Sequence, residues 1–393
     1  MKLDQGTKKN ACIVGVGRSI ISRDSGKTAA NLMSDAIVAA VKDAGLTKKD
    51  IDGLATHGMA GANGYDLNEH LRFPEINWYG QMELPQVTAM WGVLEAAMAV
   101  EYGACKYAVA VMGLMKPKGT GSKGSRRDPF AGVVGAPRIS GNQQFMTPFG
   151  AGGFIFVFWM ARHMWQFGTP RETFGHIAVT QRKHAVMNPR AIARTPLTME
   201  DYMSARMIAS PMCLYDCDYP VDGYAAVVIT TPERARHLPN KPVQIICGSQ
   251  NTGPRTDTLQ WDDMAYDGAK FCSQKMWSLA GGLTVKDMDL ACLYDGFTIL
   301  TVNWIENLGF CKLGEAKDFL KGDRMQLGGT GPTLNPHGGM CSEGRVHGMG
   351  FIAEAADQLM GRCGPRQVPN AKRAVVANGA GVQCACMVLQ TLD

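Results

Sequence analysis

The residues of this chain best suited to chemistry gather in one glycine-rich stretch near its C-terminal end. Residues 328–350 read GGTGPTLNPHGGMCSEGRVHGMG, and a helical pattern, FIAEAADQLMG, follows directly. Glycine-rich backbone lets a ligand approach amide groups closely, and the first amides of a helix carry partial positive charge. The stretch also contains two imidazoles and a guanidinium, from His337, His347 and Arg345. We therefore predict a site that stabilises a developing oxyanion, although glycine content alone would favour an ordinary wide turn.

A regular alternation of strand and helix patterns precedes this stretch. The apolar run at residues 11–17 (ACIVGVG) is typical of a buried parallel strand. Residues 29–44 place their apolar side chains on one face of a helix. Residues 46–58 (LTKKDIDGLATHG) then predict a capped turn and a second strand.

The same pattern occurs a second time downstream. Residues 283–296 (LTVKDMDLACLYDG) are similar to 46–58, and they too follow a predicted strand and a predicted helix, at 243–250 and 267–280. A helix of small residues, a turn, a strand and glycines also occur twice, at 92–113 and 350–381. Two copies of a βαβαβ unit predict a duplicated α/β fold in five layers.

The repeat divides the chain into two predicted halves, residues 1–245 and 246–393. Residues from about 114 to 212 have no counterpart in the other half, so we predict an inserted loop domain there, of the kind that forms lids or binding elements. The insertion begins with a basic stretch, in which three residues are candidates to neutralise a phosphorylated ligand: Lys123, Arg126 and Arg127. The alternative is that these charges only keep a loop soluble.

Composition excludes several classes of protein. Of the 393 residues 46% are hydrophobic and 19% charged, which indicates a globular protein with a large core. The net charge of +5 is small, so we expect no binding to nucleic acid. The longest apolar run is interrupted by Arg162 and His163, and the N-terminus has no secretory pattern, so we expect no membrane span and a cytoplasmic location. Twelve cysteines without paired ligand spacing predict reduced thiols and no metal site.

Several motifs in the same order resemble the thiolase superfamily over almost the full chain. They are YDGFT at 294–298, ENLGFCKLGE at 306–315, NPHGGMCSEGRVHGM at 335–349 and ANGAG at 377–381. They look most like the branch of sterol-carrier-protein thiolases and lipid-transfer-protein-like enzymes, which includes steroid side-chain aldolases and acyl-CoA thiolases. The resemblance implies a thiolase-like duplicated fold.

The resemblance also implies ligands and partners. The expected substrate is a CoA thioester, with coenzyme A itself as a substrate and no covalently bound cofactor. The basic residues of the insertion then become candidates for the CoA phosphates. The resemblance also implies that two copies of this chain form a homodimer within a hetero-oligomer. The other component is a small subunit that carries a zinc ribbon and an oligonucleotide/oligosaccharide-type barrel.

The chain departs from the thiolase pattern at the residues that carry thiolase chemistry. The nucleophilic cysteine of the family corresponds to Gln86 or a close neighbour, the histidine of the glycine-rich loop to Arg345, and the cysteine of the last strand to Ala377. The asparagine of the first oxyanion site corresponds to Tyr294. Either no acyl-cysteine forms, or another thiol such as Cys341 replaces the usual one.

Cleavage of the bond β to a thioester requires oxyanion donors and a group that transfers a proton. We expect His347 in this role first, then His337 and Tyr294, with Asp295 orienting a neighbour. Backbone amides could supply further donors, at Gly338, Gly339 and Gly379. The alternatives are that the tyrosine only anchors its hydroxyl in a core and that His337 only stabilises the loop.

Arg345 is suited to bind a carboxylate, because a guanidinium stays charged and does not transfer protons. The hypothesis that follows is thiolytic cleavage of a β-ketoacyl-CoA with a second carboxylate, such as benzoylsuccinyl-CoA. The alternative is retro-aldol cleavage of a β-hydroxyacyl-CoA, which requires no nucleophile. A third hypothesis is an acyl-CoA-binding scaffold without activity.

Overall fold

The computed structural model describes six stretches of the chain: residues 10–57, 61–82, 88–116, 155–251, 268–380 and 383–392. Four residues named above lie outside them: Gln86, at the position of the thiolase nucleophile, and the candidate CoA-phosphate residues Lys123, Arg126 and Arg127.

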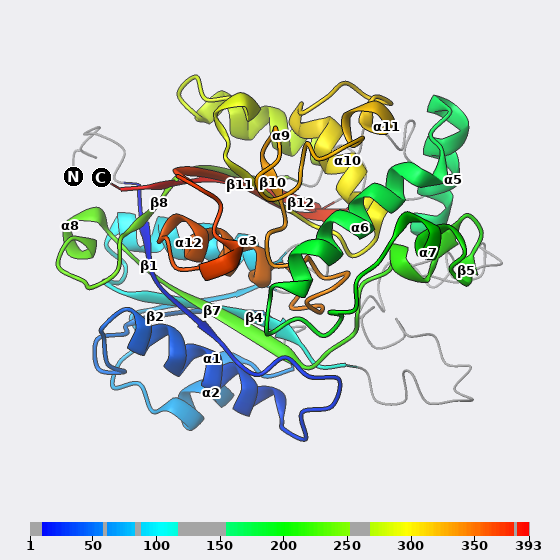
Figure 1. Ribbon diagram of the computed structural model, residues 1–393. Helices are drawn as coiled ribbons and strands as arrows, with labels where there is room; N and C mark the ends of the chain where they lie inside the picture. Colours follow the sequence, from blue (N-terminus) through cyan, green and yellow to red (C-terminus); the bar gives the residue numbers. More distant parts are fainter. Residues whose placement is uncertain are drawn as a thin grey trace, which may run out of the picture.

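Ten strands form one continuous sheet, in the order β10-β9-β11-β12-β8-β1-β7-β4-β2-β3 (Figure 1). In chain order, the strands of this sheet are β1 (Cys12–Arg18), β2 (Gly53–His57), β3 (Trp78–Met82), β4 (Ala108–Leu114), β7 (Gly223–Thr230), β8 (Val243–Asn251), β9 (Leu290–Leu293), β10 (Thr333–Leu334), β11 (Arg373–Ala380) and β12 (Gln383–Thr391). A separate hairpin pairs β5 (Met207–Ala209) with β6 (Met212–Cys213).

Strands of the two predicted repeats pair in the same way. β4, β2 and β3 are parallel in one half, and β11, β9 and β10 are parallel in the other. The strand at residues 11–17, by contrast, is antiparallel to both of its neighbours, β7 and β8, so its prediction as a parallel strand was wrong. The physical reason is that a central antiparallel strand covered on both faces needs the same continuous apolar run as a parallel one.

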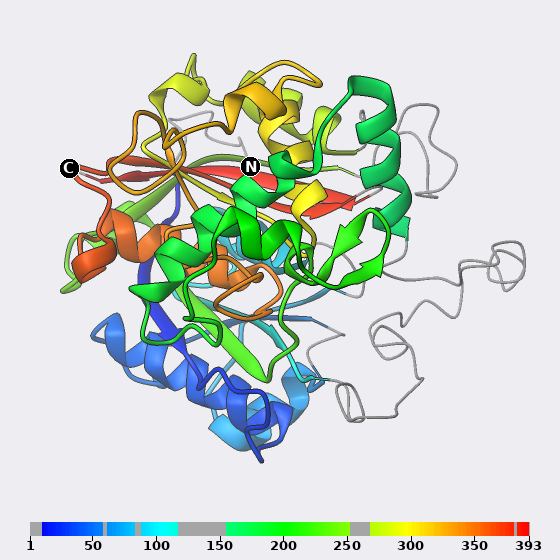
Figure 2. The ribbon, with the colours of Figure 1, turned by 45° about the vertical axis from the view of Figure 1, so that its right-hand side comes forward.

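The helices complete five layers, as the duplicated pattern predicted (Figures 1 and 2). α1 contacts β1, β7 and β4 from one side, and α9 contacts β8, β11 and β12 from the other. Between them, α3 and α12 each contact strands from both ends of the sheet. The helices are α1 (Ala29–Asp43), α2 (Gly64–Leu71), α3 (Thr88–Tyr102), α5 (Ile155–Phe167), α6 (Arg171–Val186), α7 (Met199–Met203), α8 (Pro232–Ala235), α9 (Gly268–Leu279), α10 (Thr298–Leu308), α11 (Ala316–Phe319) and α12 (Met349–Leu359).

Glycine allows the first helix to pack close to the central strand. A Cβ atom on Gly17 would lie 2.1 Å from the backbone nitrogen of Ala40, and one on Gly15 would lie 2.4 Å from the Ala40 carbonyl oxygen. Because real Cβ contacts are never so short, only glycine at these positions allows α1 to lie directly on β1.

The described part of the predicted insertion consists of α5, α6, α7 and the β5–β6 hairpin, at one end of the molecule (Figure 1). α6 packs on α10, and α5 also contacts α10. Strand β8 spans residue 245, where the sequence divides the two repeats. The division into halves at that residue stays a prediction.

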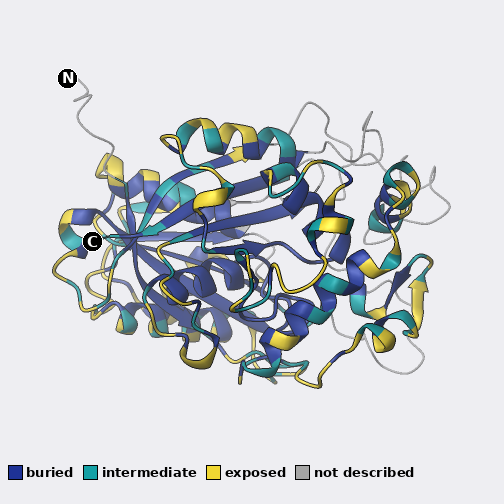
Figure 3. Cartoon of the chain, turned by 45° about the horizontal axis from the view of Figure 1, so that its top comes forward, coloured by how far each residue is buried: buried dark blue, intermediate teal, exposed yellow. Residues whose placement is uncertain are grey.

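Burial follows the layers. Most strands of the large sheet and the middle helices are largely buried, whereas exposed residues lie on the outer helices, on the last strand β3 and at the rims (Figure 3). Every residue of α12 is buried, including Glu354, Asp357 and Gln358. Because buried charges need partners, the residues around α12 must supply groups that pair with these side chains.

Candidate active site

Two loops meet at the edge of the sheet. The first follows β9 and comprises residues 294–297, called here the tyrosine loop; the second lies between β10 and α12 and comprises residues 335–348, called the glycine loop. The Asn335 side chain joins them, since its Oδ1 accepts from the Leu293 amide at 2.8 Å and its Nδ2 donates to the Leu293 carbonyl at 2.9 Å. The end of β9 and the start of the glycine loop therefore keep a fixed relative position.

Asp295 is a second connection between the loops. Its carboxylate accepts hydrogen bonds from the backbone amides of Met340, at 2.9 Å, and Cys341, at 3.2 Å. A Cβ on Gly339, whose φ is +65°, would lie 2.0 Å from Asp295 Oδ2. Burial raises the pKa of Asp295 to about 7. These contacts make Asp295 an anchor for the glycine loop.

The three residues expected to do chemistry lie around one buried phenylalanine. The ring of Tyr294 is 6.3 Å from that of His347 and 6.2 Å from that of Phe351, and the His337 ring is 5.1 Å from Phe351, centroid to centroid. Tyr294 and His347 meet edge to face. The structure therefore brings together side chains from two loops that are distant in sequence, as far apart as Tyr294 and His347, and their roles stay predictions.

The histidines have unused hydrogen-bonding capacity. Nδ1 of His337 and Nδ1 of His347 are buried, and no described residue forms a hydrogen bond to either. Burial lowers the pKa of both imidazoles, and that of His347 is well below its usual range, with Arg345 acting in the same direction. Both rings are therefore neutral at pH 7, so each has one nitrogen that donates and one that accepts.

A buried asparagine that the sequence did not reveal, Asn378, lies against Gly348, the residue that follows His347. Neither side-chain atom of Asn378 has a hydrogen-bond partner among the described residues, although the residue is buried. A Cβ on Gly348, whose φ is +92°, would lie 2.2 Å from Asn378 Nδ2. A buried amide without partners is costly, so Asn378 is a further candidate to bind a ligand.

The predicted backbone donors differ in their availability. The Gly338 amide donates to the Asn335 carbonyl at 2.8 Å and so is already engaged within the loop. The Gly339 carbonyl accepts from the amides of Ser342 and Glu343. At Gly379, in β11, the carbonyl accepts from Trp304 Nε1 at 3.0 Å. Donation to a ligand by the amides of Gly339 and Gly379 stays a prediction.

The environment of Cys341 does not favour a nucleophile. Its Sγ donates to the backbone carbonyl of Asp295 at 3.0 Å. Burial, and after it the nearby side-chain carboxylate of Asp295, raises the pKa of the thiol well above its usual range. The thiolate, not the thiol, is the reactive species. Cys341 thus contributes a contact between the loops and stays protonated.

Arg345 has an internal carboxylate partner. Its Nε lies 3.3 Å from Oδ2 of Asp218, a residue that the sequence reading did not identify. Both side chains are buried, with exposed fractions of 10% and 6%. Asp218 lies in the segment CDYPVDG, which reads as a simple turn before β7, so no local pattern points to it. The guanidinium expected to bind a substrate carboxylate is therefore already paired.

Helix α6 covers the glycine loop from outside (Figure 2). Arg182 Nε donates to Ser342 Oγ at 3.0 Å. Just beyond the helix, Asn188 Nδ2 donates to the His337 carbonyl and to Glu343 Oε1, both at 2.8 Å. The predicted insertion thus supplies part of the support of the loop.

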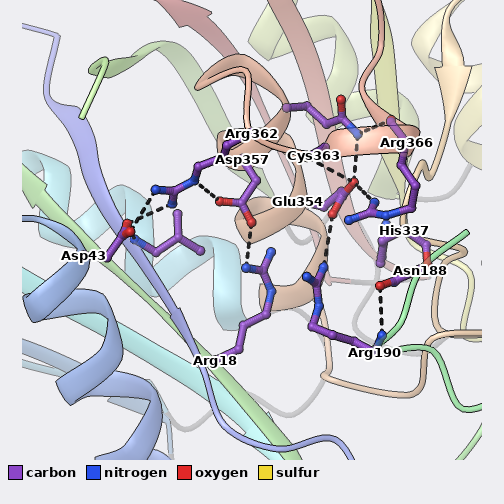
Figure 4. Close-up of polar contacts among 12 residues, drawn as sticks. Arg18, Asp43, Asn188, Arg190, His337, Glu354, Asp357, Arg362, Cys363 and Arg366 are labelled. Carbon is purple, nitrogen blue, oxygen red and sulfur yellow. Dashed lines mark hydrogen bonds and ion pairs between the residues drawn. The ribbon is translucent and has the colours of Figure 1, made fainter. Parts of the chain in front are cut away.

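A buried network of charges stabilises the other side of His337 (Figure 4). Glu354 pairs with Arg366, and its second oxygen lies 3.5 Å from Arg190 Nη2. Glu343 lies 3.9 Å from His337 Nε2 and 3.3 Å from Arg190 Nε. Burial opposes ionisation of both glutamates, but nearby positive groups lower their pKa below the usual value.

The network continues toward the N-terminal half. Arg18 pairs with Asp357 at 2.6 Å, and Arg362 joins Asp357, at 2.7 Å, to Asp43, at 2.8 Å (Figure 4). These pairs connect α12 to β1 and α1. The helix that follows the glycine loop is therefore fixed to both halves of the fold.

Two features are absent from the described part of the chain. There, no three or more His, Cys, Asp and Glu side chains come together in a way that could bind a metal ion. Among the helices of the same residues, none combines the length and the apolar character needed to cross a bilayer. The predicted cytoplasmic location stays a prediction.

Comparisons with known proteins agree with this arrangement. A family model described as Thiolase C-terminal domain-like matches residues 254–391. The 17-hydroxy-3-oxo-4-pregnene-20-carboxyl-CoA lyase of Mycobacterium tuberculosis is 33% identical over 96% of this chain and 98% of its own length. Benzoylsuccinyl-CoA thiolase subunit BbsB of Thauera aromatica is 29% identical, over 57% of this chain and 58% of its own.

Among solved structures, a chain of the Ltp2-ChsH2(DUF35) aldolase superposes with a TM-score of 0.88 and 30% identity, over 98% of both chains. Similarity at this level covers both sheet halves, the tyrosine loop and the glycine loop. The chain belongs to the thiolase superfamily, in its sterol-carrier-protein-2 thiolase branch.

Proposed function

We propose that this protein is an aldolase that splits a β-hydroxyacyl-CoA into an acyl-CoA and an aldehyde or ketone, by retro-aldol chemistry. The observation that carries the proposal is the site itself: it combines Tyr294, His347 and the Asp218–Arg345 pair, while its thiol, Cys341, is protonated and bonded to the Asp295 carbonyl. A retro-aldol reaction needs proton transfer and an oxyanion site, but no nucleophile.

This proposal replaces thiolytic cleavage as the first hypothesis. Relatives named an aldolase and a lyase match nearly the whole chain at 32% and 33% identity. Relatives named acetyl-CoA acetyltransferase match it at 26% identity or less, and the named thiolase subunit matches little more than half of it. Arg345 also gives less support to a dicarboxylic substrate such as benzoylsuccinyl-CoA, because its charge is already balanced by Asp218, whose Oδ2 lies 3.3 Å from the arginine Nε. We therefore propose an acyl group without a second carboxylate.

In the proposed reaction, the electron pair of the broken Cα–Cβ bond passes to the thioester oxygen as an enolate. Neutral His347 donates a hydrogen bond to this oxygen, and the Asn378 amide, whose donor atoms no described residue uses, is a second donor. The Tyr294 hydroxyl, whose pKa burial raises, also acts as a donor and not as a base. Preorganised donors of this kind stabilise the charge that develops in the transition state.

We also propose two protein partners. The first is a small subunit of the kind named DUF35 in the aldolase structure that this chain resembles. The second is another copy of this chain. In the described part of the chain β3 is the last strand of the sheet, and apolar side chains of the neighbouring helices α2 and α3 are exposed: Tyr65 at 81%, Met98 at 54% and Tyr102 at 77%. An open sheet edge with exposed apolar residues favours pairing with a second chain.

The test is cleavage with and without coenzyme A. The protein, alone and with a DUF35-type subunit, is incubated with three β-hydroxy thioesters and one β-keto thioester. The first three are β-hydroxybutyryl-CoA, β-hydroxy-β-phenylpropionyl-CoA and the steroid thioester that names the Mycobacterium tuberculosis lyase, and the fourth is benzoylsuccinyl-CoA. We expect cleavage of at least one without added CoA. Cleavage that starts only when CoA is added, and only of β-keto thioesters, would establish thiolysis instead.

A further inference from the structure

Three buried aspartates lie around the tyrosine loop, and one of them differs from the others. Asp216 accepts hydrogen bonds from Tyr202 at 2.7 Å, Thr298 at 2.6 Å and the Cys213 amide at 2.7 Å. Asp295 accepts from two backbone amides of the glycine loop. Both carboxylates are used in holding the structure together.

No described residue donates a hydrogen bond to the carboxylate of Asp218. The one ion pair that it forms with another described residue is with Arg345, at 3.3 Å, and this separation is longer than that of a good charge-assisted hydrogen bond. Only 6% of its side chain is exposed. A buried carboxylate with free acceptor positions is costly for stability, so a function is the natural reason for it.

The backbone holds Asp218 between the two loops of the site. Its amide donates to the Gly296 carbonyl at 3.2 Å, so it lies against the tyrosine loop. On the other side, the Tyr219 amide donates to the Met340 carbonyl at 3.1 Å, and the Arg345 amide donates to the Tyr219 carbonyl at 2.9 Å. The segment that carries Asp218 thus runs between the tyrosine loop and the glycine loop and bonds to both.

We propose that Asp218 is the base of the reaction, taking the proton of the substrate's β-hydroxyl group. The proposal rests on the retro-aldol function proposed above. The O–H bond of the substrate breaks and its proton passes to the carboxylate. The electron pair of that O–H bond forms the new carbonyl bond, and the electron pair of the broken Cα–Cβ bond passes to the thioester as an enolate. The α-carbon of the enolate then takes a proton from water, and Asp218 returns its proton to the hydroxide that is left, so that no proton is gained or lost and no further reactant is needed.

The other groups of the site are less suited to this step. Arg345 stays charged, and Tyr294 stays protonated because burial raises its pKa. Burial raises the pKa of Asp218 to about 6, while Arg345 opposes the shift. At pH 7 the carboxylate is thus ionised, yet it is more basic than an ordinary aspartate, as an efficient base requires.

Several titratable and charged groups surround Asp218 and contribute to the pH dependence of the reaction. From the tyrosine loop these are Tyr294 and Asp295, from the glycine loop Cys341 and Arg345, and from its own segment Cys217. Burial raises the pKa values of Tyr294, Cys341 and Cys217 well above 7, so these three groups are neutral between pH 5 and 8. Asp295, at about 7, titrates closest to Asp218.

The experiment compares Asp218→Asn, Arg345→Met and the double variant, with the β-hydroxyacyl-CoA that the wild type cleaves best. We expect Asp218→Asn to reduce kcat roughly 10²- to 10⁴-fold and to abolish the rise of kcat/KM with pH near 6. The double variant separates catalysis from charge pairing. If Asp218 is the base, the double variant stays as inactive as Asp218→Asn. If Asp218 only neutralises Arg345, the double variant regains activity because both charges are gone.

Folding and binding are measured on the same variants, by thermal unfolding and by titration with the acyl-CoA product. The double variant contains no unpaired charge, so it folds even if Asp218→Asn does not. Restored activity in the double variant, or a pH profile unchanged by Asp218→Asn, would overturn the proposal for Asp218 alone. A wild type that cleaves β-keto thioesters with CoA and no β-hydroxy thioester would instead overturn the proposed function, and this proposal with it.

Discussion

The buried pair of Glu354 and Arg366 provides a quantitative test of the network beside His337. In Arg366→Met the aliphatic part of the side chain is retained, but Glu354, which has no exposed surface, loses its closest positive partner. Arg366 Nη1 also donates to the Pro336 carbonyl, at 3.2 Å, so the start of the glycine loop loses a donor. Breaking a buried pair by removing one partner costs about 3–5 kcal/mol.

The remaining contacts of Glu354 place the effect within this range. Arg190, at 3.5 Å, still partly balances the charge, but its side chain is 34% exposed, so its attraction is weakened by solvent. Gln358 still donates to Glu354 Oε1 at 2.9 Å. We therefore expect a loss of about 3 kcal/mol in the free energy of unfolding at pH 7, together with a lower kcat from a displaced glycine loop.

Urea unfolding at several pH values is the assay. In the wild type, the pKa of Glu354 lies below its usual value. Ionised Glu354 therefore stabilises the fold at pH values above the pKa that it has in the unfolded chain, and this contribution is lost as pH falls. In Arg366→Met, burial dominates and the pKa rises above the unfolded value. The unpaired carboxylate then destabilises the fold at pH 7, and it is neutralised as pH falls. The decrease in the free energy of unfolding relative to the wild type should therefore be smaller at pH 5 than at pH 7.

Two variants serve as controls. The double variant Arg366→Met/Glu354→Gln removes both charges and should cost less at pH 7 than Arg366→Met alone, with a weaker dependence on pH. Arg23→Met changes an exposed arginine and should alter stability by less than about 0.5 kcal/mol. A loss in Arg366→Met below about 1 kcal/mol, or one that does not change with pH, would refute the account of this network.

Three further changes test the site. Cys341→Ala should keep kcat within about threefold of the wild type in steady-state assays, because its thiol is not a nucleophile; an inactive but folded variant would contradict this. Tyr294→Phe should lower kcat roughly 10²-fold with little change in thermal unfolding, and unchanged turnover would remove the tyrosine from the mechanism. Gly339→Ala forces a side chain into a left-handed backbone next to Asp295, so it should cost at least roughly 1–2 kcal/mol on urea unfolding; a stable, fully active variant would show that Asp295 does not anchor the loop.

The sequence predicts most of the fold because the spacing of apolar residues within each segment indicates whether it forms a helix or a strand. The helix expected at 29–44 is Ala29–Asp43, and the strand and helix patterns of the two repeats occupy equivalent layers. The direction of β1 could not be predicted, because a strand covered on both faces has the same apolar run whatever its neighbours do.

The site was predicted only in part, for a related reason. Tyr294, His337 and His347 belong to segments with recognisable motifs, and they lie together around Phe351. Asp218 has no motif: its proximity to Arg345 arises from backbone hydrogen bonds to two loops distant in sequence. Pairing between distant charges depends on tertiary structure, so one sequence does not reveal it.

The most direct test of the central claim is the identity of the product that contains the β-carbon. In a single turnover with enzyme in excess, the products of a β-hydroxyacyl-CoA are separated and identified by mass spectrometry. Retro-aldol cleavage predicts a free aldehyde or ketone and one acyl-CoA, with no mass added to the protein. A second acyl thioester, whether on coenzyme A or on a cysteine of the chain, would contradict it.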